Sequence, residues 1–128
     1  MRELLVAEVE RIDPTSEDAF VTLNSESGQV VAFSFPCGYD VGNYVGNLLH
    51  ADFVVELQSP YFKDWPAVER ELASRERLDR TGAYSYSGCG RVIDHNNGLV
   101  QACGFVIDFG EVPSGTEFVE FEVTRFSL

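Results

Sequence analysis

The clearest pattern in the chain lies near its C-terminus, where apolar and polar residues alternate. In the segment 118–126, FVEFEVTRF, Val119, Phe121 and Val123 share one parity, and Glu120 and Glu122 share the other. Side chains of a β-strand point alternately to opposite faces, so the segment predicts a strand with one buried face and one acidic, solvated face. A chain that contains this strand must build a sheet to cover its apolar face.

A second long strand is predicted just before it. Residues 99–109 carry apolar side chains on both faces, which is typical of a strand covered on both sides or of one inside a barrel. The sequence Pro113-Ser114-Gly115 predicts the turn that joins these two strands.

Five earlier strands are predicted from the same alternation and from the turn-forming residues between them. They cover residues 2–12, 19–23, 30–35, 51–57 and 84–94. In the first we place Leu5, Ala7 and Val9 on one face and Glu8 and Glu10 on the other. In the third we place Val31, Phe33 and Phe35 inward, and in the fourth we place Ala51, Phe53, Val55 and Leu57 on one face.

One helix is predicted over residues 64–80. Asp64 is a candidate N-cap, Pro66 lies in the first turn, and Gly82 follows the end. Residues 38–49 leave two interpretations open. Glycine recurs there at every fourth position without matching a phosphate-binding motif, so the segment is either a long loop or a short helix capped by Asp40.

Together these elements predict a mainly β fold, all-β or α+β. We expect an antiparallel barrel or sandwich of about seven strands, with the helix inserted between the fourth and fifth. The 128 residues are most simply one domain, 1–128, with 1–62 and 83–128 as possible halves linked by the helix. Residues 30–57 and 105–123 are similar enough to suggest a duplicated β unit, although convergent strand composition explains them equally well.

The loop at Gly115 is followed by Val119-Glu120-Phe121-Glu122-Val123. In this respect the segment 104–123 resembles the closing strands of cold-shock and other oligonucleotide-binding barrels, which often carry a glycine-led turn and then V-x-F-E-V. The resemblance implies a barrel. The basic and aromatic RNA-binding pattern of the cold-shock family is missing from this chain.

The formal net charge is −12, and the strand-rich segments carry all of it, because residues 63–80 sum to zero. Such a charge repels phosphate backbones and favours a basic partner. We therefore expect no nucleic-acid partner. No secretory signal and no membrane-spanning run are found, and the three cysteines form no CxxC pair. These features predict a cytoplasmic protein with reduced thiols, including Cys89 and Cys103, and no contact with a membrane.

No catalytic residue, metal site or cofactor is predicted. His50 and Asp52 share a strand face but lack a third ligand nearby, and Asp94 and His95 belong to a turn signal. The favoured function is a small, acidic, bacterial-type protein-interaction module without catalytic activity. Its candidate binding residues are Tyr39, Asp40 and Tyr44 in the glycine-rich segment, and Glu120 and Glu122 on the acidic strand face.

Two alternatives stay open. One is an inhibitor or immunity-type protein that neutralises a basic partner such as a nuclease toxin, which predicts salt-sensitive binding. The other is a β-barrel that binds a small ligand. The sequence predicts no oligomeric state.

Overall fold

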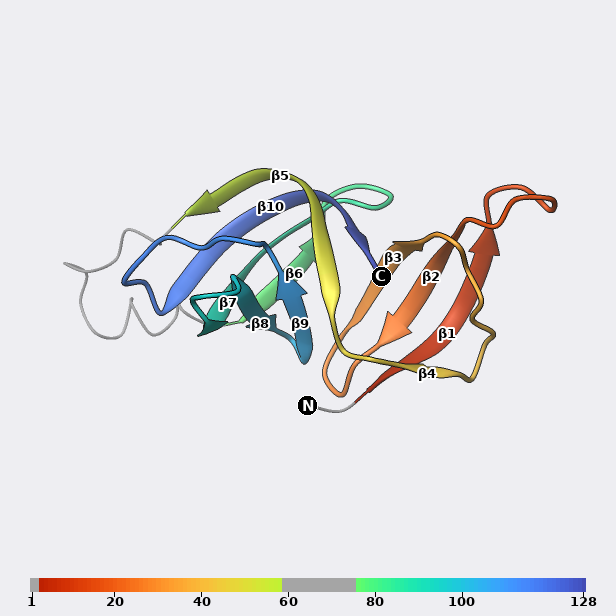
Figure 1. Cartoon of the computed structure of the whole chain (residues 1–128), viewed down its shortest axis with the longest axis horizontal. Coiled ribbons are helices and arrows are strands. Elements are labelled where there is room, and N and C mark those ends of the chain that lie inside the picture. The colour runs from red at the N-terminus through yellow and green to blue at the C-terminus, as the bar shows by residue number, and fades with distance from the viewer. Residues whose placement is uncertain (1–2, 59–75) are drawn as a thin grey trace.

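A computed structural model describes residues 3–58 and 76–128 of the chain. This part contains ten β-strands that belong to one sheet (Figure 1). The strands are β1 (Leu4–Arg11), β2 (Ala19–Asn24), β3 (Gln29–Ser34), β4 (Tyr44–Val45), β5 (Leu49–Gln58), β6 (Arg77–Arg80), β7 (Tyr86–Asp94), β8 (Leu99–Ala102), β9 (Phe105–Asp108) and β10 (Phe118–Ser127).

Five of the strands close into a barrel. They follow each other in the order β10-β5-β9-β8-β7, and β7 pairs with β10 to complete the circle. Every contact in the circle is antiparallel except the one between β5 and β9, which is parallel. A mainly β fold that contains a barrel is thus confirmed, but the barrel has five strands rather than about seven and is not purely antiparallel. The segment that resembles oligonucleotide-binding barrels supplies β9 and β10, the two neighbours of β5.

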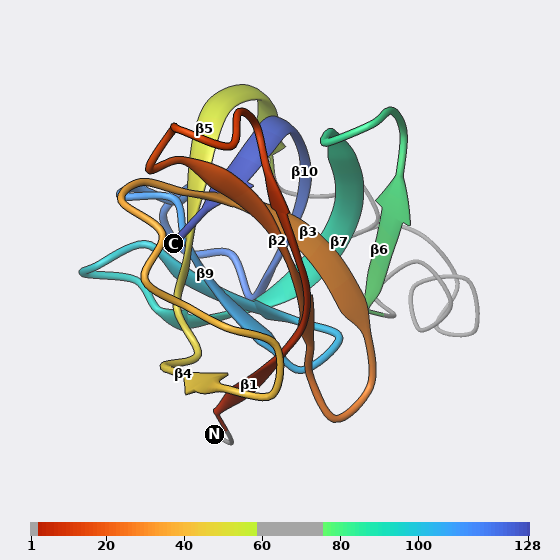
Figure 2. The same ribbon diagram turned by 90° about the vertical axis from the view of Figure 1, so that its right-hand side faces the viewer.

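The N-terminal strands extend this sheet sideways in the order β4-β1-β2-β3 (Figure 2). They join the barrel through the end of β10, where Phe126 and Ser127 pair in parallel with Ala32 and Phe33 of β3. The backbone N–H of Leu128 also donates to the Phe33 carbonyl at 2.9 Å. The C-terminus therefore lies beside β3 (Figure 1).

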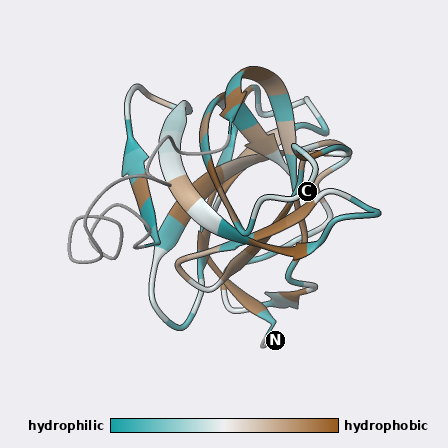
Figure 3. Cartoon of the chain, turned by 90° about the vertical axis from the view of Figure 1, so that its left-hand side faces the viewer, coloured by the Kyte–Doolittle hydropathy of each residue, from teal (hydrophilic) through white to brown (hydrophobic). Residues whose placement is uncertain are grey.

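One apolar core runs from the barrel to the N-terminal sheet. It contains Phe105, Ile107 and Val119 in the barrel and Val21 and Leu23 in β2, all fully buried. The hydrophobic residues accordingly concentrate along the strands, whereas the edge strand β6 is largely hydrophilic (Figure 3). As predicted, β10 places Val119, Phe121 and Val123 in this core.

The predicted helix over residues 64–80 is not observed where the structure can test it. Residues 77–80 form strand β6, which pairs with β7, so the prediction is wrong there. Backbone hydrogen bonds to β7 outweigh the weak helix-favouring charge pairs of this segment. The remainder of the prediction, residues 64–75, lies outside the described residues.

The predicted hairpin between residues 99–109 and 118–126 is also wrong. Residues 99–109 form two strands, β8 and β9, because Cys103 and Gly104 make a tight turn with φ angles of +49° and +81°. Positive φ at both central residues is the signature of a two-residue hairpin turn. Strand β9 then pairs with β5 rather than with β10.

A further difference concerns which face of a strand is buried. In β3 the buried residues are Val30, Ala32 and Ser34, so the prediction that Phe33 and Phe35 point inward is wrong. In β1 a bulge between Val6 and Glu8 shifts the register against β2. Leu4 and Val6 are therefore the buried residues at its start.

Residues 38–49 form a loop around the short strand β4, so the helix interpretation of this segment is wrong. The Asn47 side chain fixes the loop to β9, because its Nδ2 donates to the Gly104 carbonyl at 2.8 Å and its Oδ1 accepts from the Val106 N–H at 3.0 Å. The amide thus takes the place of a neighbouring strand backbone and satisfies the Gly104 carbonyl and the Val106 N–H.

Candidate functional site

The structure does not bring the five sequence-predicted binding residues together. Tyr39 is half-buried and packs against the core, whereas Tyr44 is exposed on β4 at one edge of the sheet. Asp40 is exposed in a turn, where its N–H bonds to the Asn43 side chain at 2.9 Å. Strand β10, which carries the two glutamates, lies in the barrel, away from β4 in both Figure 1 and Figure 2.

Glu120 and Glu122 lie in the interior of the sheet, because β10 pairs with β5 on one side and with β7 on the other. Neither glutamate therefore lies at an edge of the sheet. Glu122 is opposite Glu56 of β5 and Ser87 of β7, and Ser87 is in turn opposite Asp79 of β6. Glu56, Asp79, Glu120 and Glu122 make up an acidic face on these four strands. The face also carries Arg77, whose Nε lies 3.8 Å from Asp79 Oδ2.

A different surface combines exposed apolar side chains with unusual backbone geometry. In the middle of β5, Phe53, Val54 and Val55 are 73%, 39% and 66% exposed. The register against β10 skips Val55, and Phe53 has a φ of +52°. A bulge turns side chains away from their regular faces, and here it presents three consecutive apolar residues to solvent.

Arg125 of β10 lies next to this bulge. Its guanidinium is 4.2 Å from the centroid of the Phe33 ring and 5.8 Å from that of Phe53. Its Nε donates to Asp52 Oδ2 at 3.1 Å, which fixes the orientation of the side chain. Arginine between two aromatic rings is a favourable cation–π arrangement, and the ion pair holds it in place.

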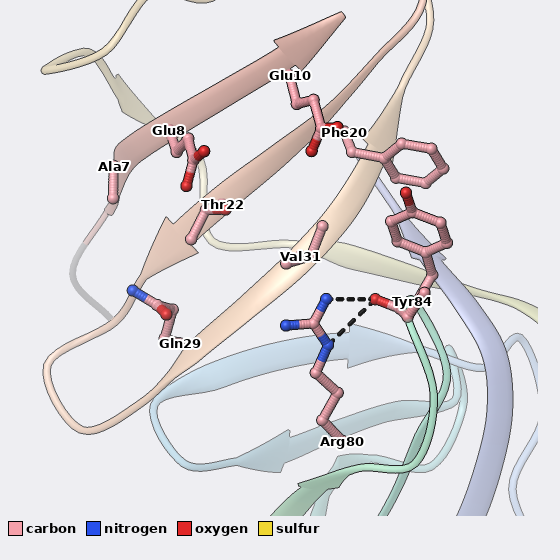
Figure 4. A pocket seen from close by; sticks show the side chains of 10 residues that line it. Ala7, Glu8, Glu10, Phe20, Thr22, Gln29, Val31, Arg80 and Tyr84 are labelled. Atoms are coloured by element: carbon pink, nitrogen blue, oxygen red, sulfur yellow. Dashed lines mark hydrogen bonds between the residues drawn. The ribbon is translucent and has the colours of Figure 1, made fainter. Parts of the chain in front are cut away.

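The aromatic contacts continue beyond Phe33 to the β6–β7 loop. Phe33 meets Phe20 of β2 edge to face, with ring centroids 5.7 Å apart. Phe20 is stacked on Tyr84 with centroids 3.7 Å apart and planes at 6°, as Figure 4 shows. Residues from five segments thus form a continuous row, which we call the aromatic strip. It comprises Tyr84, Phe20, Phe33, Arg125 and Phe53.

The surface of the strip is hollowed at Phe33 and Arg125. A cavity of about 260 Å³ is bounded there by Phe33, Arg125 and Asp52, by Phe35, and by the last two residues of the chain. Phe35 is 64% exposed although it is a large apolar residue. The combination of exposed aromatic rings, an oriented arginine and a concave surface is what protein-binding hot spots share.

Sequence reasoning missed this strip because it assigned Phe33 and Phe35 to the core. Taking Val31 as an inward residue places every second residue after it on the buried face of β3. The buried residues are instead Val30 and Ala32. One available signal was the row Phe53-Val54-Val55, which does not alternate. A non-alternating apolar run inside a strand is a sign of a bulge or of burial on both faces.

The thiols and histidines have structural surroundings. None of the three cysteines is in a disulfide, and burial raises the pKa of the Cys89 thiol, an effect that the Arg77 charge opposes and the Glu120 charge reinforces. His50 Nδ1 lies 3.5 Å from Asp108 Oδ2, whereas Asp52 pairs with Arg125, so His50 and Asp52 have different partners. Within residues 3–58 and 76–128, no three metal-ligand side chains gather at one place.

Comparisons with known proteins do not assign the chain to a family. No protein-family model matches the chain, and no characterised protein or solved structure is significantly similar to it. In the described residues, no helix is long and apolar enough to cross a membrane.

Proposed function

We propose that this chain is a non-catalytic protein-binding module whose docking surface is the Phe53 end of the aromatic strip. The observation that carries the proposal is the β5 bulge, which exposes Phe53 and Val55 beside an arginine fixed between two rings. Aromatic residues and arginine dominate the energetic centres of protein interfaces, and exposing them on a free monomer is unfavourable unless a partner covers them.

The charge of the chain indicates the chemistry of that partner. The net charge is −12, and the charge of Arg125 is already compensated by Asp52. A partner surface that is apolar at its centre and basic at its rim is complementary to this arrangement. Rim charges would accelerate association, while the buried rings would set the dissociation rate.

The test is a pull-down with the full chain from a lysate of the source organism, at low and at high salt, with the bound protein then purified and titrated. We expect Phe53→Asn and Phe35→Ser to weaken binding at least tenfold. Ile12→Asn is the matched control, because Ile12 is also a large, exposed apolar residue (53%) but lies in the β1–β2 loop. Binding that survives both strip substitutions would refute the docking surface.

A second function is favoured by the acidic face, where carboxylates of β5, β6 and β10 lie opposite each other across the sheet. Such a face suits an inhibitor that occupies the phosphate site of a basic protein. In that case the partner would dissociate in high salt, and Glu120→Gln with Glu122→Gln would weaken binding while Phe53→Asn would not. The two proposals therefore give opposite results with the same set of variants.

A further inference from the structure

A second cavity lies at the other end of the aromatic strip, and it is independent of the protein-binding proposal. Its volume is about 280 Å³, and its floor is the outer face of β1, β2 and β3 (Figure 4). Its opposite wall is the end of β6 and the loop that follows, which contribute Arg80, Ala83 and Tyr84. We call it the Arg80 pocket.

This wall is fixed to the sheet by the loop and by the first residue of β7. Tyr84 stacks on Phe20, and the hydroxyl of Tyr86 accepts a hydrogen bond from the Val31 N–H at 2.9 Å. The pocket is therefore a built space between two anchored elements. Its volume corresponds to roughly nine water molecules, which suits a ligand of about the size of an amino acid.

Arg80 is oriented before any ligand arrives. Its Nε donates to the carbonyls of Gly82 and Ala83 at 3.2 and 3.1 Å, and its Nη2 also donates to Ala83. Within the described part of the chain Nη1 has no hydrogen-bond partner, and Figure 4 shows the guanidinium facing the cavity. A guanidinium with one edge already bonded offers its remaining donors to a carboxylate at little entropic cost.

Two carboxylates face the arginine from the other side of the pocket. Glu8 and Glu10 are successive outward residues of β1, opposite Thr22 and Phe20 of β2. Strand geometry places their Cα atoms roughly 6–7 Å apart. Neither glutamate forms an ion pair with a residue that the structure describes.

We propose that the Arg80 pocket binds a free basic amino acid, such as lysine or ornithine. Its α-carboxylate would accept hydrogen bonds from Arg80, and its two ammonium groups would pair with Glu8 and Glu10. The pocket carries two negative charges and one positive charge, and a basic amino acid at neutral pH carries two positive charges and one negative. A chain of three or four methylenes separates the two ammonium groups by a distance comparable to that between the glutamates.

The remaining lining fits the same ligand. Thr22 and Gln29 offer hydrogen-bonding groups, and Val31 offers an apolar contact for methylene groups. The stacked rings of Phe20 and Tyr84 close one end of the cavity. A neutral amino acid would leave one glutamate unpaired, and a diamine would leave Arg80 unpaired, so both should bind more weakly.

The experiment is isothermal titration of the full chain with L-lysine and L-ornithine at low ionic strength. We expect saturable one-to-one binding, and at least tenfold weaker binding of L-norleucine, which lacks the side-chain ammonium, and of lysine amide, which lacks the carboxylate. The variants Glu8→Gln and Glu10→Gln should each weaken lysine binding at least fivefold. Glu111→Gln, an exposed carboxylate elsewhere, should leave it unchanged.

Arg80→Gln should abolish the preference for lysine over lysine amide, but it also removes hydrogen bonds that hold the β6–β7 loop. The two glutamate variants sit on β1 and leave that loop intact, so they keep the proposal testable. Absence of binding at 10 mM lysine, equal binding of lysine and lysine amide, or binding unaffected by both glutamate variants would each overturn it.

Discussion

Phe53 combines two unfavourable properties at one residue. Its φ of +52° is a left-handed conformation that costs an ordinary residue about 1–2 kcal/mol, and its ring is 73% exposed. The neighbouring strand supports this conformation, because Thr124 Oγ1 donates to the Phe53 carbonyl at 3.1 Å. Strained, solvated aromatic residues persist where the strain positions a side chain for a function. This is why we place Phe53 at the centre of the proposed docking surface.

Replacing Phe53 by Asn should separate stability from binding. Asparagine adopts positive φ more readily than phenylalanine, so we expect the free energy of unfolding to stay unchanged or to rise by up to about 1 kcal/mol. Chemical denaturation measures this directly. The exposed ring contributes little to the core, so its loss should lower the affinity for the partner and not the stability of the fold. A fall of more than about 2 kcal/mol would mean that Phe53 serves the fold rather than a partner.

The raised pKa of Cys89 predicts a pH dependence of stability. Because burial favours the neutral thiol, the folded-state pKa lies above the unfolded-state value near 9.0, and the Arg77 charge only partly opposes this. The stabilising contribution of the neutral Cys89 thiol is therefore fully present below the unfolded-state pKa, and it is lost as the pH rises toward the folded-state pKa. We expect the thermal unfolding temperature to decrease as the pH rises above 9, and to decrease less in Cys89→Ala.

Burial raises the pKa of Cys103 too, with the Glu76 charge as a second cause, so Cys89→Ala should remove only part of this alkaline loss. Cys103→Ala provides the comparison. If the midpoint falls equally in the wild type and in the variant that lacks both thiols, the loss arises from other groups.

At the level of elements, the packing of strand β7 against its neighbours requires glycine at Gly88 and Gly90, where a side chain would not fit. A Cβ atom at Gly88 would lie 2.3 Å from the Arg77 carbonyl and 2.8 Å from the Phe121 ring. Gly88→Ala should therefore force β6, β7 and β10 apart and lower the free energy of unfolding by roughly 1–3 kcal/mol, as overpacked cores do. Urea denaturation of the variant measures the loss.

Gly38→Ala is the matched control, because a Cβ atom there would meet nothing within 4 Å. We expect its stability to be within about 0.5 kcal/mol of the wild type. If Gly88→Ala were equally harmless, the close approach of β6 to β7 would not exist in solution.

The sequence was sufficient to predict elements whose alternation is unbroken. Strand β2 lies where the pattern put it, because its ladder keeps the same parity from end to end. Strand β10 keeps its predicted parity from Val119 to Val123, and the buried side then shifts to Phe126. Prediction from the sequence failed where a single residue shifts the alternation of buried and exposed side chains. The bulge in β1 and the turn at Cys103 depend on local backbone conformations that side-chain alternation does not encode.

The candidate sites were less predictable for the same reason. Phe33 and Phe35 could be assigned to the surface only with the register of β3 against β2 and β10. The Arg80 pocket needs a strand in residues 77–80, a segment whose charge pairs indicate a helix. Its glutamates were placed correctly on the outer face of β1, but nothing in the sequence connects them to an arginine seventy residues away.

At the scale of the whole molecule, the N-terminal sheet and the barrel share one core, and their strands are hydrogen-bonded to each other at the end of β10. The end of β10 contributes two parallel residue pairs with β3, and Phe126 is fully buried there. The Tyr86 ring of β7 stacks on Phe126 at 5.3 Å, and its hydroxyl reaches across to accept from the Val31 N–H. Tyr86 therefore links β7, β10 and β3, and it also fixes one wall of the Arg80 pocket.

Tyr86→Phe should loosen the junction between the sheet and the barrel without opening the core. The ring and its stacking on Phe126 are kept, but the Val31 N–H loses its acceptor at a half-buried position, which costs about 1–2 kcal/mol. Hydrogen exchange should localise the effect. We expect the Val31 amide and its neighbours in β3 to exchange at least tenfold faster, while amides of β9 and β10 in the barrel change much less.

Tyr44→Phe is the control, because Tyr44 is exposed and its hydroxyl makes no hydrogen bond with the described residues. Its exchange rates should match those of the wild type. Uniform acceleration across all strands in Tyr86→Phe would show that the sheet and the barrel open together as one cooperative unit. Acceleration confined to β1, β2 and β3 would show instead that the N-terminal sheet can separate from a barrel that remains closed, because the barrel's own ladder does not need the Tyr86 hydroxyl.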